Sequence, residues 1–270
     1  MTLPRVGVFD SGVGGLTVLH AMAAQIQAHY LYFGDTARLP YGTKSAETVA
    51  RYATGAARYL EAQGIDLLVI ACNSATALAL PKIEQAVRVP VIGVVEPGAR
   101  VASEVSETRS AIVIATDATV GSHAYREALQ GKGMQVYEKA CPLLVPLVEE
   151  GWIDHPVTER VAQIYLGEAA AAAPQQADVL LLACTHYPLL TPLLRRITPA
   201  HMKIVDSAES TAGAVRSVVE STQRGRAQDA AQDHRSFRFF ATDSVEKFKM
   251  LATRFLGRQV DRVEHVDLGG

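Results

Sequence analysis

Two cysteines stand in matching sequence surroundings. Cys72 closes the run Asp-Leu-Leu-Val-Ile-Ala-Cys that begins at Asp66, and Cys184 closes the run Asp-Val-Leu-Leu-Leu-Ala-Cys that begins at Asp178. A single cysteine after an apolar strand is usually a small buried core residue. Because this pair recurs together with its flanking residues, we expect the two cysteines to share a chemical role.

Such a pair suits a reaction that treats both faces of one carbon atom alike. A thiolate on one face removes a proton, a thiol on the other face returns one, and the stereocentre is inverted without a cofactor. We expect a helix to begin at each cysteine, because a helix N-terminus stabilises a thiolate and lowers the thiol pKa from about 8.5. Nearby polar side chains fit supporting roles: His186 in proton transfer, and Asn73, Ser74 and Thr185 in binding an anion.

Other uses of the cysteines fit the spacing less well. Zinc-binding and redox-active cysteines usually come as C-x-x-C pairs, which this sequence lacks, so we expect no metal ion and no disulfide exchange. A cysteine hydrolase would leave one of the two cysteines without a role. The third cysteine, Cys141, lies outside the repeat, and we expect it to be a packed core residue.

Two turns and one carboxylate are further candidates. Residues 10–15, Asp-Ser-Gly-Val-Gly-Gly, follow an apolar segment, but Asp10 stands where a dinucleotide-binding loop needs glycine, and its carboxylate would repel phosphate. Residues 34–42 suit either a surface loop or a substrate lip that presents the backbone N–H groups of Tyr41 and Gly42. Glu149, taken by itself, suits a solvated carboxylate at a helix end.

Short apolar segments alternate with longer helical patterns along the chain. We expect strands over residues 6–9, 30–33, 67–71, 111–114, 179–182, 203–205 and 237–240, and helices over residues 14–28, 45–63, from 74 onward, and 245–256. Unbroken apolar strands between helices are typical of an α/β fold, in which helices cover both faces of a parallel sheet. Residues 221–236 are polar without apolar periodicity, which favours a mobile surface loop.

The repeat predicts two similar α/β units with mainly parallel sheets. Residues 94–208 would form the second unit, and residues 1–93 together with residues 209–270 the first. Each unit would then present one cysteine at the carboxyl end of a strand, where open α/β sheets bind ligands. We therefore expect the active site in the cleft between the units.

Composition sets the class of protein. Apolar residues make up 49% of the 270 residues, enough for a sizeable core, and a net charge of −2 argues against a dedicated nucleic-acid binder. Three cysteines are too few for a disulfide-stapled secreted scaffold, and no apolar run reaches the roughly 18 residues of a membrane helix. We expect a soluble protein of the reducing cytoplasm that does not associate with a membrane.

Several motifs occur in a recognisable order: FDSGVGGLTV, GDTARLPYG, ACNSATA, PLVEEG, ACTHYPLL and the C-terminal FFATDSVEKFKMLATRFLG. Together they resemble the glutamate racemases, within the cofactor-independent aspartate/glutamate racemase superfamily, and the resemblance runs essentially end to end. It implies an isomerase that interconverts L- and D-glutamate and supplies D-glutamate for peptidoglycan synthesis, and thus for cell wall biogenesis and cell shape. It implies glutamate as the small-molecule substrate, no cofactor, no metal and no need for nucleic acid; a homodimer stays open.

The resemblance also implies roles for individual residues. Cys72 and Cys184 are the implied acid/base pair, with Asp10 beside Cys72 and with His186 and Glu149 on the side of Cys184. The implied substrate contacts are Asp10, Ser11, Tyr41, Gly42, Asn73, Ser74, Thr185 and His186.

Two departures and two alternatives remain. Ser74 stands where the family usually has threonine, and Ala183 where it usually has glycine, which would narrow the turn behind Cys184. The alternatives are a related racemase of aspartate or another acidic amino acid, and a non-catalytic α/β ligand-binding protein with structural cysteines.

Overall fold

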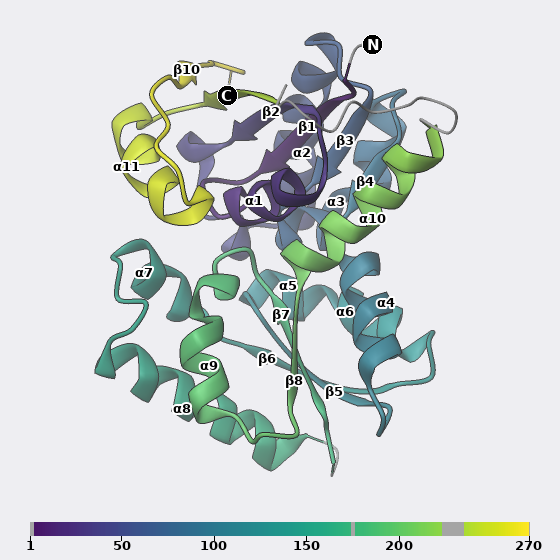
Figure 1. The fold of residues 1–270 in the computed structure, drawn as a ribbon, viewed down its shortest axis with the longest axis vertical. Helices are drawn as coiled ribbons and strands as arrows, with labels where there is room; N and C mark the ends of the chain where they lie inside the picture. The colour runs from purple at the N-terminus through teal and green to yellow at the C-terminus, as the bar shows by residue number, and fades with distance from the viewer. Residues whose placement is uncertain (1–2, 174–175, 223–234, 270) are drawn as a thin grey trace.

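The computed structural model describes residues 3–173, 176–222 and 235–269. Within them the chain forms two parallel β-sheets with helices on both faces, one sheet in the upper half of Figure 1 and one in the lower half. No helix among the described residues is long and apolar enough to cross a membrane. The expected α/β fold is confirmed.

The first sheet combines strands from both ends of the chain. Its order is β10-β9-β2-β1-β3-β4, and every neighbouring pair is parallel. The strands are β1 (Arg5–Asp10), β2 (His29–Gly34), β3 (Leu67–Ile70), β4 (Val91–Gly93), β9 (Ser236–Ala241) and β10 (Glu264–His265). β3 is buried along its whole length, which explains why its sequence is apolar without alternation.

The second sheet uses one continuous stretch of chain. Its order is β6-β5-β7-β8, again with every pair parallel. The strands are β5 (Ser110–Ala115), β6 (Gln135–Ala140), β7 (Val179–Ala183) and β8 (Lys203–Asp206). This order matches β2-β1-β3-β4 of the first sheet strand for strand, so the predicted pair of similar α/β units is confirmed.

The helices cover both faces of each sheet. The first sheet is accompanied by α1 (Leu16–Gln25), α2 (Ala46–Ala62), α3 (Asn73–Ala86), α10 (Ser207–Thr222) and α11 (Val245–Leu256), and the second by α4 (Val95–Val105), α5 (Asp117–Ser122), α6 (Ala124–Gln130), α7 (Leu144–Glu149), α8 (Pro156–Ala172) and α9 (Thr191–Ile197). Short 3₁₀ helices are η1 (Thr36–Arg38), η2 (Tyr41–Thr43) and η3 (Tyr187–Leu190). α2 and α3 pack on one face of the first sheet, and α1, α10 and α11 on the other. α8 and α9 pack on one face of the second sheet, and α4 and α6 on the other.

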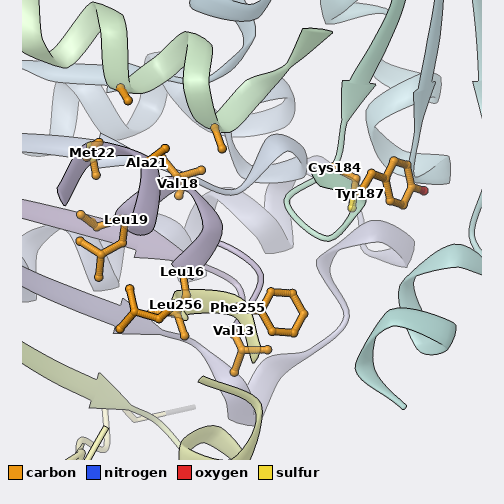
Figure 2. Close-up of a cluster of buried hydrophobic side chains, with 14 of the residues drawn as sticks. Val13, Leu16, Val18, Leu19, Ala21, Met22, Cys184, Tyr187, Phe255 and Leu256 are labelled. Atoms are coloured by element: carbon orange, nitrogen blue, oxygen red, sulfur yellow. The ribbon is translucent and has the colours of Figure 1, made fainter. Parts of the chain in front are cut away.

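One hydrophobic core runs from the first sheet into the second. It contains Leu16 and Leu19 of α1, Phe255 of α11, and Cys184 and Tyr187 from the loop after β7 (Figure 2). The α1 face of the first sheet is therefore continuous with the α8 face of the second. The chain passes to the second sheet between β4 and β5 and returns between β8 and β9. The domain boundaries proposed above, at residues 93/94 and 208/209, stay a prediction.

Some elements differ from the sequence expectation. β6 is an edge strand in which Gln135, Glu138 and Lys139 interrupt the apolar residues, and β4 has only three residues, so neither shows a long apolar run. The first helix spans Leu16–Gln25, shorter than residues 14–28, because residues 10–15 form the turn that enters it. Of the loop expected over residues 221–236, Ser221 belongs to α10 and Ser236 begins β9, and residues 223–234 lie outside the described residues.

Candidate active site

Cys72 lies where β3 ends and α3 begins. It is the N-cap residue of α3, and its Sγ accepts a hydrogen bond from the backbone N–H of Ala75 at 3.4 Å. Its thiol also donates to Ser11 Oγ at 3.5 Å, from the turn after β1. The residue is 5% exposed. The expectation that a helix begins at Cys72 is confirmed.

The electrostatics of Cys72 differ from the expectation. Burial raises the pKa of the thiol to about 12, and the nearby carboxylate of Asp10 adds to the rise. Hydrogen bonds with Ser11 and with the N–H of Ala75 lower the pKa but do not compensate. The predicted lowering of this pKa by a helix N-terminus is therefore wrong, because desolvation outweighs the helix end. Cys72 is a thiol at neutral pH.

Asp10 ends β1 beside Cys72. One carboxylate oxygen, Oδ2, accepts from the N–H of Gly12 at 2.9 Å, while Oδ1 is buried with no hydrogen-bond partner among the described residues. Burial raises the pKa of Asp10, against the lowering effect of backbone N–H groups and of His186. Gly15 makes this arrangement possible, since a Cβ there would lie 2.6 Å from Asp10 Cβ. Gly15 thus allows close packing around the Asp10 carboxylate. A carboxylate at this turn agrees with the sequence argument against a nucleotide-binding loop.

Cys184 follows β7 in the second unit. The loop after it leads into the short 3₁₀ helix η3 and then α9, so the expected helix N-terminus at Cys184 is not an α-helical one. Its Sγ lies 3.9 Å from His186 Nδ1, and His186 Nε2 lies 3.2 Å from Glu149 Oε1 at the end of α7. The structure thus brings Cys184, His186 and Glu149 into one chain of contacts.

His186 carries a positive charge in these surroundings. Burial lowers its pKa, but hydrogen bonds with Cys184 and Glu149 and their negative charges outweigh burial and raise the pKa to about 10. In return, the hydrogen bond with His186 lowers the pKa of Glu149. A charged imidazole ring thus lies beside Cys184, whereas a carboxylate lies beside Cys72 and favours its thiol form. The two cysteines therefore have opposite electrostatic neighbours.

The entry to α1 joins the two units at the site. Thr17 Oγ1 donates to the carbonyl of Thr185 at 2.9 Å. A Cβ on Gly14 would lie 2.2 Å from Thr185 Oγ1 and 2.6 Å from the ring of His186. The absence of a side chain at Gly14 lets the turn after β1 contact the loop that carries Cys184.

A cluster of hydroxyl groups bridges the units on the other side. Ser74 Oγ of α3 lies 3.0 Å from Thr116 Oγ1 and 3.2 Å from Thr119 Oγ1, and the two threonine hydroxyls are 3.1 Å apart. Gly42 packs against Thr116, since a Cβ added at Gly42 would lie 3.2 Å from Thr116 Cβ. Sequence reasoning did not select Thr116 and Thr119. The sequence does contain a signal for Thr116: it directly follows β5, just as Ser11 directly follows β1, the equivalent strand of the first sheet.

Asn73 and Tyr41 are held by partners of their own. Asn73 Oδ1 accepts from Tyr125 OH at 2.6 Å, and Asn73 Nδ2 donates to Ser207 Oγ at 3.3 Å. Tyr41 OH donates to the buried carboxylate of Asp35 at 2.5 Å. The tyrosine side chain thus fixes the loop that carries Tyr41 and Gly42. Tyr125, Ser207 and Asp35 are further residues that the sequence did not reveal as supports of the site.

The third cysteine, Cys141, is a core residue. Cys141 is fully buried and belongs to the hydrophobic core, as expected. Within the part of the chain that the structure describes, no three His, Cys, Asp or Glu side chains are grouped so as to hold a metal ion.

Comparison with known proteins gives consistent matches. The family model for Asp/Glu/hydantoin racemase matches residues 6–215. The glutamate racemase of Koribacter versatilis is 58% identical over 286 residues, covering 99% of this chain and 98% of the relative. A glutamate racemase isoform of Bacillus anthracis has a similar structure, with a TM-score of 0.90, 35% identity and 98% of each chain covered. The structure of Francisella tularensis glutamate racemase in complex with D-glutamate gives a TM-score of 0.88 at 31% identity, with 99% of each chain covered.

Proposed function

The chain belongs to the glutamate racemases of the Asp/Glu/hydantoin racemase family, and on this basis we propose that it interconverts L- and D-glutamate with Cys72 and Cys184 as its two acid/base residues. Membership makes it an isomerase that acts on an amino acid. Glutamate as the substrate is supported by the complex of the Francisella tularensis relative with D-glutamate.

One observation carries the two-cysteine mechanism. Cys72 and Cys184 follow equivalent strands, β3 and β7, of two sheets with the same strand order. Their surroundings also differ, because burial beside the carboxylate of Asp10 keeps Cys72 protonated, whereas Cys184 Sγ lies 3.9 Å from Nδ1 of the charged His186 ring. A base and an acid are thus ready at the same time, as inversion of a stereocentre requires.

The reaction then runs in two proton transfers. For L-glutamate, the Cys184 thiolate takes the proton from Cα and becomes a thiol, while the Cys72 thiol gives its proton to the opposite face and becomes a thiolate. For D-glutamate the roles reverse. His186 stabilises negative charge on Cys184, and Glu149 keeps His186 charged and oriented.

The α-proton of an amino acid is a very weak acid, so the carboxylate must be stabilised as it gains enediolate-like charge. Preorganised N–H and O–H donors in a site without bulk water supply this stabilisation. We assign this role to the backbone and hydroxyl donors of Ser11, Gly42, Asn73, Ser74 and Thr185, together with Thr116 and Thr119, which share hydrogen bonds with Ser74. Independence from a cofactor, the supply of D-glutamate for peptidoglycan and the cytoplasmic location stay predictions.

The test uses single variants and deuterium. Cys72→Ala and Cys184→Ala should each lower racemisation about 10³-fold or more, because one face of Cα then lacks its acid/base group. Each variant should still exchange the Cα proton of one enantiomer in heavy water: Cys72→Ala that of L-glutamate, and Cys184→Ala that of D-glutamate. Chiral chromatography and mass spectrometry measure both quantities.

Cys141→Ala is the matched control, since this thiol is buried in the core and outside the repeat; it should keep turnover and lose a little stability. Near-normal racemisation by either catalytic variant, or equal exchange of both enantiomers by one variant, would contradict the two-cysteine mechanism. Equal kcat/KM for aspartate and glutamate would favour the racemase of another acidic amino acid instead.

A further inference from the structure

The helix α11 comes from the C-terminal part of the chain and packs with the first sheet, yet it contacts the second unit behind Cys184. Arg254, in its last turn, donates hydrogen bonds from its guanidinium group to the backbone carbonyls of Val148, at 3.2 Å, and of Glu149. These two residues end α7, the six-residue helix that carries the Glu149 carboxylate. The Val148 carbonyl also accepts from the N–H of Gly151 at 3.0 Å, so Arg254 adds a second donor there and donates to the Glu149 carbonyl at the very end of the helix.

The turn after α7 leaves room for this guanidinium. Gly151 has a φ of 85°, in the left-handed region that favours glycine. A Cβ at this position would lie 2.6 Å from Arg254 Nη2. The carbonyls of Val148 and Glu149 and the missing side chain of Gly151 thus accommodate the same guanidinium group.

The same helix also reaches the His186–Glu149 pair directly. The ring of Phe255 meets the His186 ring edge to face, with 5.0 Å between centroids. Lys247 Nζ lies 3.8 Å from Glu149 Oε2, although this lysine side chain is 59% exposed and contributes little. Phe255 fixes the ring and Arg254 fixes the backbone that presents the carboxylate.

We propose that Arg254 is a positioning residue for racemisation: by holding the end of α7, it keeps the Glu149 carboxylate on His186 and so maintains the charge that supports Cys184. The inference rests on the proposed two-cysteine function. It assigns Arg254 no contact with the substrate. Because its contacts all lie on the Cys184 side, its effect belongs to that half of the reaction.

The pH dependence of kcat distinguishes a positioning role from a purely structural one, because a purely structural role would leave the pH profile unchanged. The titratable and charged groups around His186 are Cys184 from its own loop, Glu149 from α7, Asp10 from β1, and Lys247 and Arg254 from α11. Glu149 is one of the two groups that raise the pKa of His186 to about 10. If Glu149 is no longer held, this pKa falls, and the imidazolium is lost at a lower pH.

The experiment replaces Arg254 by methionine, which keeps the length of the side chain and removes its donors. Arg254→Met should lower kcat about tenfold, since a charge-assisted hydrogen-bond contact is lost, while KM for glutamate stays within about twofold. The alkaline limb of the pH–kcat profile should shift toward neutral pH. In a Cys72→Ala background, Arg254→Met should also slow deuterium exchange into L-glutamate.

Three further variants sharpen the test. Lys249→Met is the matched control on the same helix: among the described residues Lys249 pairs only with the exposed Glu246, so its loss should leave kcat and the pH profile unchanged. Arg254→Lys should restore part of the rate. Gly151→Ala should displace the guanidinium from the opposite side and shift the alkaline limb in the same direction, so it carries the test if Arg254→Met does not fold.

A double-mutant cycle separates positioning from general stability. In a Glu149→Gln background, Arg254→Met should cause no further shift of the alkaline limb, because both changes act through one contact. An unchanged profile for Arg254→Met and Gly151→Ala, or effects of Arg254→Met and Glu149→Gln that add fully, would overturn the inference. Failure of the unaltered protein to racemise glutamate would instead overturn the proposed function.

Discussion

At the residue scale, Cys72 and Cys184 have similar flanking sequences but differently charged neighbours, Asp10 beside Cys72 and His186 beside Cys184. Both cysteines can be identified as candidates from the sequence, because each follows an apolar strand in a recognisable repeat. It does not reveal that burial beside Asp10 raises the pKa of Cys72, nor that Glu149 and Cys184 keep His186 charged, because these effects depend on contacts made across the fold. Conversely, the role of Glu149 was suggested only by family resemblance, since a helix-end carboxylate has no distinctive local pattern.

Gly14→Ala tests a close contact between the two units. The new Cβ would lie 2.2 Å from Thr185 Oγ1 and 2.6 Å from the His186 ring, so the Cys184 loop must move. We expect kcat to fall about 100-fold and the free energy of unfolding to fall by about 1–3 kcal/mol, as in overpacked cores. Gly55→Ala in α2 is the control: its Cβ meets nothing within 4 Å, and it should keep kcat and gain about 0.5–1 kcal/mol in stability. Steady-state kinetics and thermal unfolding measure both; a Gly14→Ala variant with normal kcat would show that the loop position is not critical.

At the scale of elements, the strands that the sequence predicts most accurately are those buried on both faces. Strands buried on both faces, such as β3 and β7, have unbroken apolar runs, and each was predicted to within one residue at its ends. β6 is missed, because Gln135, Glu138 and Lys139 interrupt the apolar residues of this partly exposed edge strand. The repeated aspartates have a structural explanation that sequence alone does not provide. Asp66 accepts a hydrogen bond from the N–H of Arg5 at the start of β1, and Asp178 accepts from the segment that leads into β5.

Asp178→Asn tests this connection between strands. Burial raises the pKa of Asp178, but hydrogen bonds from Ser106, Glu107 and Thr108 prevail and lower it to about 2. A carboxyl group with a pKa lowered by folding stabilises the protein above its unfolded pKa of about 3.9, and this stabilisation is lost as the pH falls toward 2. The variant should therefore lose about 1–3 kcal/mol at pH 7 and show a weaker loss of stability between pH 4 and pH 2. Urea unfolding at several pH values measures this.

The counterpart in the first unit supplies the comparison. Within the described ranges, the Asp66 carboxylate accepts one hydrogen bond where that of Asp178 accepts several, so Asp66→Asn should cost less stability than Asp178→Asn. Equal losses for the two variants at pH 7 would contradict the assignment of the stabilisation to these hydrogen bonds.

At the scale of the whole molecule, the site depends on segments far apart in the sequence. The repeat in the sequence predicts the two similar units, but it cannot predict that β9 pairs with β2 or that α11 contacts the end of α7, because neither contact has a counterpart in the other unit. The C-terminal part of the chain thus completes both the first sheet and the surroundings of His186.

A chain that ends at residue 222 tests this dependence. It lacks β9, α11 and β10, so β2 becomes an exposed edge strand and Phe255 and Arg254 no longer support His186 and α7. We expect aggregation or loss of the cooperative unfolding transition, with no measurable racemisation. Size-exclusion chromatography, calorimetry and a chiral assay check the outcome, and a monomeric, active truncated protein would contradict it.

The division of the two sheets along the chain also sets an order of events on the ribosome. The second sheet uses residues 110–206 without interruption, so all of its strands have been synthesised well before the end of translation. The first sheet begins at Arg5 but lacks β9 until residue 241 has left the exit tunnel. Domains generally fold as units as they emerge. The first sheet is therefore the first to begin and the last to be completed. Until β9 has been synthesised, β2 remains an unpaired edge strand of the nascent chain.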